Sequence, residues 1–263
     1  MSKTLTIVAS NRDRLDFGTP SGKLFLDSLE AQTNQDFEVI IADGGSKNYD
    51  ELEKFMAERV CEPHIRIVKE QLGEKFERAR LNNVGVRNAT TPYIMTTDVD
   101  MCFGAEFVDN LLSRVAPNKF VESRTRYWRG KLVNRIYSGE LNPFTDLDSC
   151  QNGRIKKRTT AGGCQCAHID QWTKVRGFDE DFIGWGSEDF DLLTRMMNSG
   201  AKVDWMGEAP DIVRLFHQPH AKPNIKEDLE CQKKNQKLLK RVKMGQRPFT
   251  ANPNGWGGID PNK

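Results

Sequence analysis

The sequence lacks any apolar run near the ~20 residues that a membrane-spanning helix needs. It also lacks a strong net charge, because 39 Lys and Arg stand against 37 Asp and Glu, a formal net charge of +2. No global field therefore draws the protein to nucleic acid or to an anionic membrane. Internal repeats and low-complexity tracts are absent too. With 37% hydrophobic residues, the chain can form one large α/β domain, or one domain with an elaborated second half.

A CxxC pair is also missing. The six cysteines are scattered, and Cys164 and Cys166 have no partner cluster that would suit zinc. We therefore expect reduced thiols rather than a disulfide framework. Met1 and the next two residues lead directly into a predicted strand rather than into a signal peptide, so a cytoplasmic protein without a transmembrane segment is expected.

The first hundred residues alternate between strand and helix patterns. Strands are predicted over 5–10, 37–42, 65–69 and 93–100, and helices over 23–32, 50–59 and 74–88. Such alternation predicts an α/β fold with a mainly parallel, twisted central sheet and helices on both faces. Its length and turn placement are typical of a nucleotide-binding half.

The second half is less regular. Helices are predicted over 105–115, 168–175 and 224–243, and strands over 120–127 and 212–216. Residues 128–158 are polar, basic and rich in turn formers, which indicates a mobile loop or lid. The last helix is basic, and the Gly-, Pro- and Asn-rich residues beyond it are expected to form a loose flap.

One motif combines a glycine-flanked tryptophan with three carboxylates. It consists of Gly184, Trp185, Gly186, Glu188, Asp189 and Asp191. Apolar residues at helical spacing follow, so the acids lie at a predicted helix N-terminus, where unpaired backbone N–H groups and the dipole favour negative charge. A helix cap with surface acids is the alternative. The slim glycine turn and the flat tryptophan face favour a binding site.

A second acidic pair ends the predicted strand over 93–100. Asp98 and Asp100 are two residues apart, so in an extended strand both point to the same side. They would converge at the carboxyl edge of the sheet, where ligands bind in open α/β folds. Two hard oxygen ligands suit Mg²⁺ or Mn²⁺, especially when phosphate oxygens complete the shell.

These motifs, in this order, resemble those of glycosyltransferases with the GT-A fold. The similarity covers nearly the whole chain and is carried by Ala9-Ser10-Asn11-Arg12, Asp43-Gly44-Gly45-Ser46, Arg80 with Asn82-Asn83-Val84-Gly85, Asp98-Val99-Asp100, Gly162-Gly163, Gly177-Phe178-Asp179-Glu180, Gly184-Trp185-Gly186-Ser187-Glu188-Asp189 and His217. It is strongest toward inverting enzymes such as β-1,4-galactosyltransferases, chondroitin-polymerase modules and family-two transferases. The motifs are specific for the fold and much less so for the sugar.

The resemblance implies a set of donor-binding residues. They are Ser10, Arg12, Asp43, Arg80, Asn83, Asp98, Gly163 and Trp185. Asp43 would contact the uracil or ribose, Arg80 and Asn83 would lie over the diphosphate, and Trp185 would stack on a sugar face. A solvated loop is the alternative for the residues after the first strand, and a surface helix position is the alternative for Arg80.

A metal site is implied as well. The resemblance assigns Mn²⁺, or Mg²⁺, to Asp100 and His217, with Asp98 contacting ribose or the metal through water. His220 competes with His217 for the histidine position. Mixed carboxylate, imidazole and phosphate ligands suit Mn²⁺ better than Ca²⁺.

Asp189 is the candidate base, because an acceptor hydroxyl must lose its proton as the nucleotide leaves. Glu188 would orient the acceptor hydroxyls, and Asp191 is open to a structural role as a helix cap. Retaining relatives often have Glu-Asn where this chain has Glu188 and Asp189, which by analogy favours inversion.

The sequence thus predicts a metal-dependent, inverting GT-A glycosyltransferase that moves a sugar from a nucleotide-sugar, with a UDP-sugar as the expected donor, to a glycan or another hydroxyl acceptor. Residues 1–100 would bind the donor, 101–222 would bind the acceptor, and 223–263 would form the basic helix and tail. The alternatives are transfer to a nucleic-acid base or another non-glycan acceptor, a nucleotidyltransferase, and a non-catalytic binding module. Basic residues over 124–158 and in the tail leave a nucleic acid or an anionic glycan open as a partner.

Overall fold

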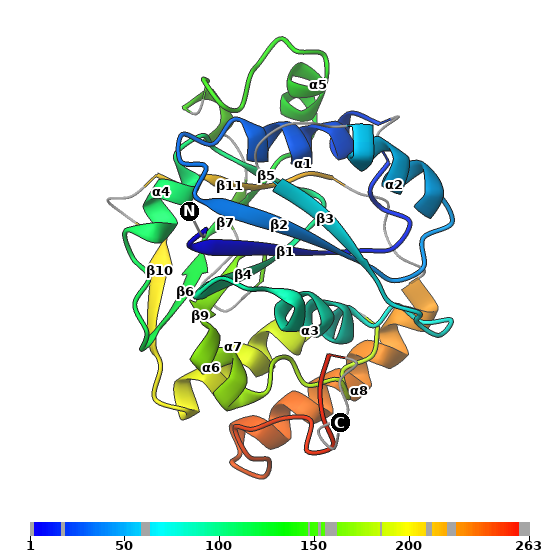
Figure 1. Ribbon diagram of the computed structural model, residues 1–263, viewed down its shortest axis with the longest axis vertical. Coiled ribbons are helices and arrows are strands. Elements are labelled where there is room, and N and C mark those ends of the chain that lie inside the picture. Colours follow the sequence, from blue (N-terminus) through cyan, green and yellow to red (C-terminus); the bar gives the residue numbers. More distant parts are fainter. Residues whose placement is uncertain are drawn as a thin grey trace.

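The computed structural model describes residues 3–16, 19–58, 64–146, 148–151, 154–155, 162–184, 186–208, 212–219 and 225–257. A seven-stranded sheet with helices on both faces occupies the centre, and a four-stranded sheet lies beside it (Figure 1). None of the helices in these ranges is both long enough and apolar enough to cross a membrane.

The large sheet has the strand order β10-β6-β9-β4-β1-β2-β3. Its strands are β1 (Leu5–Asn11), β2 (Phe37–Asp43), β3 (His64–Lys69), β4 (Tyr93–Asp98), β6 (Lys119–Ser123), β9 (Gln165–His168) and β10 (Lys202–Met206). The pairs β1–β2, β2–β3, β1–β4 and β6–β10 are parallel, whereas β9 runs antiparallel to both β4 and β6. The predicted mainly parallel sheet is confirmed.

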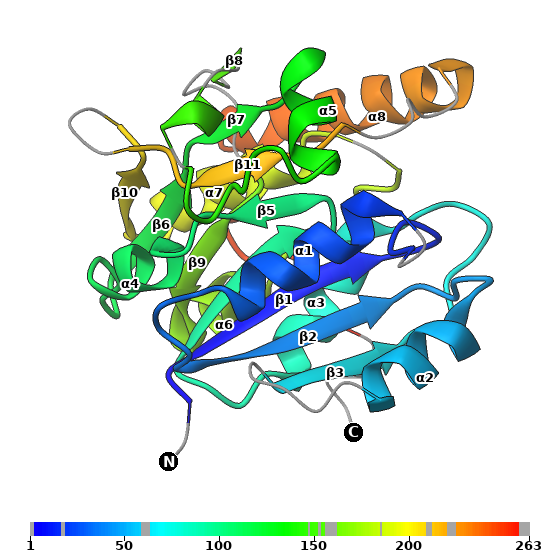
Figure 2. The same cartoon turned by 90° about the horizontal axis from the view of Figure 1, so that it is seen from above.

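Alternating side chains of the central strands enter two cores, one on each face of the sheet. Ile7 and Ala9 of β1 face one core, and Val8 faces the other. The first core is covered by α1 (Pro20–Glu30), α2 (Tyr49–Glu58) and α4 (Phe107–Leu112). The second is covered by α3 (Arg78–Asn88), α6 (Ile169–Val175) and α7 (Glu188–Asn198). Figure 2 shows α1 against the sheet from above.

The segment over 128–158, expected to be a mobile loop or lid, contains a helix and one strand of the small sheet. The strand order of the small sheet is β5-β11-β7-β8, formed by β5 (Met101–Phe103), β11 (Leu215–His217), β7 (Thr125–Tyr127) and β8 (Arg154–Ile155), with α5 (Lys131–Tyr137) and a 3-10 turn (Ser149–Gln151) nearby. Trp128 stacks on Phe216 with ring centroids 4.8 Å apart, and Val133 and Ile136 are buried around them. A third apolar core therefore holds much of the segment over 128–151 in place, which the polar composition of 128–158 concealed.

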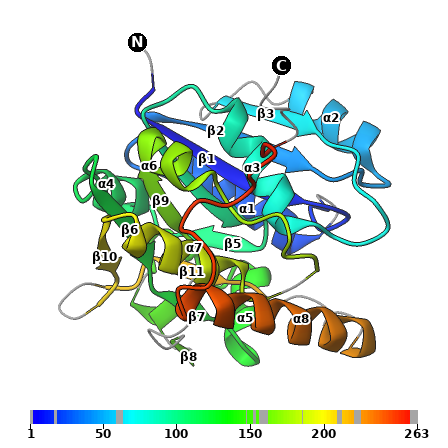
Figure 3. The ribbon, with the colours of Figure 1, turned by 90° about the horizontal axis from the view of Figure 1, so that it is seen from below.

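The C-terminal region is also more ordered than expected. The predicted basic helix is present as α8 (Ile225–Lys243), and it packs along α7 (Figure 3). Beyond it, Ala251 and Trp256 are buried, and the Asn252 amide donates to two backbone carbonyls of the loop after α6. The expected loose flap is therefore wrong for residues 244–257.

Several element boundaries differ from the prediction. The helix expected over 74–88 begins only at Arg78, and the strand expected over 120–127 is divided into β6 and β7. β5, β9 and β10 are short strands that the apolar patterns did not reveal. The described cysteines are free, as expected, whereas Cys61 lies outside the described residues.

Close packing between α3 and β1 fixes the rotation of α3. Gly85 lies against Val8 so tightly that a Cβ on Gly85 would be 2.2 Å from Val8 Cγ1. Since Val8 is a stiff, fully buried side chain in the central strand, neither partner can yield easily. The contact determines which α3 side chains face the carboxyl edge of the sheet.

We predict that Gly85→Ala lowers the free energy of unfolding by about 1–3 kcal/mol through overpacking. Gly73→Ala is the matched control, because the nearest atom to its Cβ would be a Glu77 side-chain oxygen at 3.7 Å. We expect that variant to stay within about 0.5 kcal/mol of the parent. Urea unfolding of both variants measures the difference, and equal stabilities would contradict the packing argument.

Candidate active site

The carboxyl ends of the parallel strands meet at one edge of the large sheet. Asn11 at the end of β1 lies beside Asp43 at the end of β2, and Ser10 lies beside Asp98 at the end of β4. Open α/β sheets bind ligands at this edge. Ser10, Asp43 and Asp98, three of the predicted donor-binding residues, therefore lie at the edge of the sheet where ligands bind.

Arg78, the first residue of α3, joins the two acidic motifs. Its Nε donates to Asp98 Oδ1 at 2.7 Å, and its Nη1 donates to Asp189 Oδ1 at 2.8 Å and to Glu188 Oε1 at 3.3 Å. Burial alone lowers the pKa of Arg78, but the three carboxylates outweigh burial and hold that pKa well above its usual range. The structure thus brings Asp98, Glu188 and Asp189 to one point, through an arginine that the sequence motifs did not single out.

Arg80 and Asn83, the residues predicted to contact the diphosphate, bind other protein groups and do not join the Arg78 cluster. Arg80 pairs with Glu70 at 2.6 Å, and the Asn83 amide both donates to and accepts from the backbone of Phe178. Residues two positions apart on a helix are rotated by about 200°, so Arg78 and Arg80 point in different directions. Arg78 therefore takes the central position in this cluster, and the contacts of Arg80 and Asn83 with the diphosphate stay predictions.

Asp98 and Glu188 bind the same arginine but titrate differently. Burial raises the pKa of Asp98, but the charge of Arg78, with a smaller contribution from His217, lowers that pKa by more than burial raises it. The pKa of Asp98 therefore lies below its usual range. Burial, reinforced by the neighbouring Asp189, raises the pKa of Glu188 to about 7. The Glu188 Oε2 atom is buried and has no hydrogen-bond partner among the described residues. Glu188 can therefore gain or lose a proton near neutral pH.

Asp189 is held from three directions, although its side chain stays 19% exposed. Arg78 binds Oδ1, and Gly162 lies so close to Oδ2 that a Cβ there would be 2.3 Å away. Gln165 on β9 donates from Nε2 to the Asp189 backbone carbonyl at 3.2 Å and to Glu122 on β6 at 2.7 Å. Gln165 and Glu122 are fully buried polar residues on short strands, a signal that sequence patterns did not separate from ordinary core.

Gly163 has a structural reason to be glycine. Its φ is +98°, its carbonyl accepts from Thr97 Oγ1 at 2.7 Å, and a Cβ there would be 2.8 Å from Thr125 Oγ1. Both glycines lie close to protein groups, Gly162 to Asp189 and Gly163 to Thr125, and the role of Gly163 in donor binding stays a prediction.

Asp43 organises the loop after β2. Its side chain is fully buried and accepts from the backbone N–H groups of Gly45 and Ser46, from the Ser46 hydroxyl and from the Asn11 amide. Four such bonds commit both carboxylate oxygens to the turn. Asp43 therefore shapes the loop, and its contact with uracil or ribose stays a prediction.

Arg12 and Ser10 have different surroundings at the end of β1. Arg12 donates to the backbone carbonyls of Gly73 and Lys75, so it ties the loop before α3 to β1. Ser10 is 4% exposed, and its hydroxyl has no hydrogen-bond partner within the described part of the chain. Of these two residues, Ser10 is the one whose side-chain hydroxyl can still form a hydrogen bond with a ligand.

The predicted metal ligands Asp100 and His217 lie next to each other. His217 Nε2 is 3.8 Å from Asp100 Oδ1, and Arg14 donates to Asp100 Oδ2 at 3.1 Å. The His217 ring stacks on Tyr127 at 4.5 Å, and its Nδ1 lies 2.6 Å from the carbonyl oxygen of Gln218. Because a carbonyl only accepts, Nδ1 carries the proton of this hydrogen bond, and Nε2 is the ring nitrogen that faces Asp100.

A complete protein cage for a metal is not formed within the described ranges, since no group of three His, Cys, Asp or Glu side chains converges there. Asp98, the third predicted ligand, is turned to Arg78. His220, the competing histidine, and Trp185, the predicted stacking residue, lie outside the described residues. Their roles remain predictions.

Asp191 has a structural role, but not as a cap. It is fully buried and binds Arg195 Nε at 2.6 Å, and Arg195 also donates to the backbone carbonyls of Val175 and Gly177. This buried ion pair fastens α7 to the loop after α6. The two aspartates of the motif thus face opposite sides of α7.

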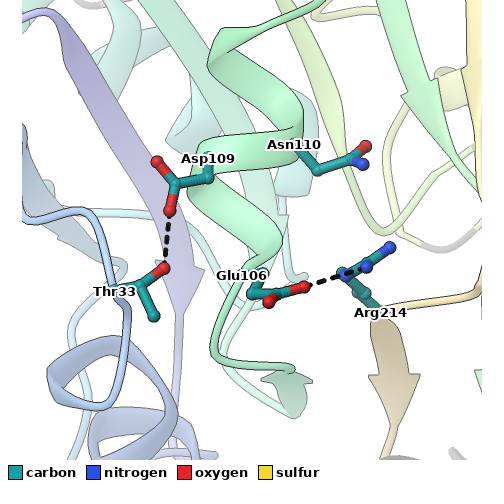
Figure 4. Close-up of a pocket in the computed structure, with 5 residues that line it drawn as sticks. All are labelled: Thr33, Glu106, Asp109, Asn110 and Arg214. Carbon is teal, nitrogen blue, oxygen red and sulfur yellow. Dashed lines mark hydrogen bonds and ion pairs between the residues drawn. The ribbon is translucent and has the colours of Figure 1, made fainter.

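A separate hollow lies beside α4, near the start of β2 (Figure 4). It has a volume of about 410 Å³ and is lined by Thr33, Glu106, Asp109, Asn110 and Arg214. Thr33 donates to Asp109 at 2.6 Å, and Arg214 pairs with Glu106 at 3.0 Å. None of the predicted site residues lines it, and its ion pair and hydrogen bonds join lining residues to one another or to Asn34.

The fold and this edge of the sheet define a class of protein, the GT-A glycosyltransferases. Two solved structures match most of the chain at low identity. S. aureus TarS residues 1–349 in complex with UDP-GlcNAc matches 91% of this chain and 66% of its own, with TM-score 0.60 and 11% identity. The Pyrobaculum calidifontis mannosyltransferase PcManGT, in complex with GDP-Man and Mn²⁺, matches 96% and 67%, with TM-score 0.61 and 15% identity.

The chain belongs to glycosyl transferase family 2, whose model matches residues 23–167. A second model, described as the N-terminal domain of galactosyltransferase, matches residues 149–221. The chain is therefore a member of a glycosyltransferase family. This result favours glycosyl transfer over the nucleotidyl transfer that the sequence left open.

Curated relatives share parts of the chain. Human β-1,4-galactosyltransferase 5 is 30% identical over 138 residues, which cover 52% of this chain and 30% of the relative. Escherichia coli chondroitin synthase is 24% identical over 202 residues, which cover 64% of this chain and 29% of the relative. The chain thus spans about a third or less of the length of these two relatives.

We predict that Arg78→Met lowers the free energy of unfolding by about 3–5 kcal/mol at neutral pH, because three carboxylates lose their buried counter-charge. In the parent, the lowered pKa of Asp98 contributes stability above its unfolded pKa, and this stability is lost as pH falls. In the variant the carboxylates protonate more readily, so its deficit should shrink toward acidic pH.

Arg80→Met is the matched control, because its ion pair with Glu70 is partly exposed and is worth at most about 1 kcal/mol. Chemical denaturation of both variants across a pH series is the measurement. If Arg80→Met proved the more damaging change, Arg78 would not be the organising cation.

Proposed function

We propose that the protein is a metal-dependent, inverting glycosyltransferase that moves a sugar from a nucleotide-sugar, most simply a UDP-sugar, to a hydroxyl group of a glycan. The observation that carries the proposal is the Arg78 cluster. It joins a candidate base, Asp189, to the acid that ends the central strand β4, Asp98, at the ligand-binding edge of the sheet.

The donor would lie along the carboxyl ends of β1 and β4. Ser10 presents a buried hydroxyl there, and Asp98 is its neighbour in register. The similar S. aureus structure holds UDP-GlcNAc, and the similar P. calidifontis structure holds GDP-Man. These bound molecules support a nucleotide-sugar as the donor. The UDP-GlcNAc of the S. aureus structure supports a UDP-sugar in particular.

The residues at the end of β11 suit a divalent cation. His217 would bind the cation through Nε2, and its other ring nitrogen donates to a backbone carbonyl, the arrangement that orients metal-binding histidines. Asp100 adds a carboxylate beside it. With two protein ligands, the diphosphate of the donor would complete the shell of Mn²⁺ or Mg²⁺. A cation there would offset the charge that develops on the leaving diphosphate.

Asp189 would act as the general base. It pairs with Arg78, and its side chain is 19% exposed, against 4% for the neighbouring Glu188. It would take the proton of the acceptor hydroxyl while that oxygen forms a bond to the anomeric carbon. The bond from that carbon to the phosphate oxygen breaks at the same time, and the electron pair leaves with the nucleotide. Attack opposite the leaving group inverts the configuration.

Glu188 would orient the acceptor. Its Oε2 is buried and has no hydrogen-bond partner among the described residues, so it can accept from a sugar hydroxyl that enters the cleft. With a pKa raised to about 7, Glu188 can also donate when it is protonated. Gln165 and Gly162 would keep Asp189 in place beside it.

We expect Asp189→Asn to keep donor binding and to lower transfer by about two to four orders of magnitude, the usual contribution of a general base. Asp191→Asn is the contrast, because Asp191 faces the buried Arg195. It should lose stability while keeping the rate per folded molecule. Transfer assays and calorimetric titration of UDP measure both effects, and a near-normal rate for Asp189→Asn would remove the base assignment. A product with the donor's own anomeric configuration, read by NMR, would remove the inverting mechanism.

Chelator should abolish transfer and Mn²⁺ should restore it, because Asp100 and His217 supply only part of a metal shell. Asp100→Ala should lose nucleotide-sugar binding in the presence of Mn²⁺. Asp109→Ala is the control, since Asp109 lies in the hollow beside α4 and is held by Thr33 and Asn34. Full activity in excess chelator would contradict the metal proposal.

A further inference from the structure

α8 has one face packed against the enzyme. Asn235 and Val242 are buried, and the Asn235 amide donates to the carbonyl of Ile183 at 3.1 Å. Lys243 Nζ lies 5.4 Å from the centre of the Phe190 ring on α7. The helix is therefore held in a fixed orientation, and its outer face is defined.

The outer face carries a row of cations, here called the cationic stripe. Its members are exposed and follow one another at helical spacing: Lys233, Lys234, Lys237, Lys240 and Arg241. At 100° per residue, they fall within an arc of about 120°. From residue 229 onward, the one acid of α8 is Glu230. Because the whole chain has a net charge of +2, removal of these five charges would leave it negative.

Apolar side chains flank the stripe. Leu229 is 47% exposed and Met244 is 58% exposed. At the same 100° per residue, Met244 projects within the arc of the stripe, and Leu229 projects about 20° outside the edge of that arc. Exposed apolar groups gain nothing from nucleic acid phosphates or from a polar glycan, but they can enter the acyl boundary of a bilayer.

We propose that the outer face of α8 docks on an anionic lipid bilayer. Lysine predominates in the stripe, and its long apolar stem lets the ammonium group reach the headgroups while the helix lies in the surface. Clusters of basic residues on an amphipathic helix bind anionic lipids in this way. The stripe supplies the electrostatic attraction, and Leu229 and Met244 supply shallow insertion.

Docking would place the active site near the lipid. A Cβ on Gly184 would be 3.0 Å from Cys231 Cβ, and one on Gly186 would be 3.4 Å from Gln232 Cγ, so α8 packs directly on the turn that precedes Glu188. One helix diameter, about 10 Å, separates its two faces. An acceptor carried by the membrane would then be close to the start of α7.

The experiment is co-sedimentation of the full chain with vesicles of phosphatidylcholine alone and with 30–40% phosphatidylserine, roughly a leaflet rich in anionic lipid. We expect binding to the anionic vesicles alone, and weaker binding as salt rises. Lys233→Glu/Lys237→Glu/Lys240→Glu should weaken it by at least about 100-fold, since each cation near such a surface contributes about fivefold. Vesicle binding needs no donor, metal or transfer, so its failure is separate from failure of the proposed reaction.

Lys23→Glu/Lys131→Glu/Lys202→Glu is the matched control, with the same change of net charge at exposed lysines of α1, α5 and β10. It should keep vesicle binding, and equal loss in both triple variants would overturn the proposal. Leu229→Ala/Met244→Ala should weaken vesicle binding and leave binding to duplex DNA or heparin unchanged. Tighter binding to DNA or heparin than to anionic vesicles would also overturn the lipid assignment.

Discussion

The active-site edge depends on one buried cation. Arg78 has three acids around it, contributed by β4 and by the first turn of α7, and without a positive charge these acids would repel one another in a poorly solvated space. Its planar guanidinium group binds them along different N–H directions, which an ammonium group cannot reproduce. The same contacts fix the distance between the two halves of the chain. A single side chain therefore balances the charge of these acids and holds the end of β4 beside the start of α7.

Much of this arrangement was predictable from sequence. The βα alternation gave the parallel strands, and acids at the end of an apolar strand or at a helix N-terminus indicated Asp98, Asp100, Glu188 and Asp189. His217 was indicated by its place at a strand end. The structure brings these residues to one edge, with His217 beside Asp100 and Arg78 joining the other three. Strong local patterns fix such positions because they depend on strand and helix ends.

The choice of arginine was not predictable in the same way. Arg78 and Arg80 are both near the start of a helix, and which of them faces the site depends on helix rotation. That rotation is fixed by Gly85 against Val8, a contact between distant segments. The buried roles of Gln165 and Glu122 are hidden for a related reason, since a polar residue on a short strand does not reveal which distant segment it will contact. Three-dimensional packing decides what the one-dimensional pattern leaves open.

Residues 256–257, near the end of the described chain, pack beside α3, and this affects the order in which the contacts of α3 can form during synthesis. Trp256 packs on Gly177, and Gly257 donates to Glu180, the residue that Asn83 of α3 also binds. These contacts come from residues synthesised after every other described part of the site. During translation, α3 lacks this support until the ribosome has released almost the whole described chain. The support that residues 256–257 give to α3 and the loop after α6 is therefore among the last parts of the described structure to become available during synthesis.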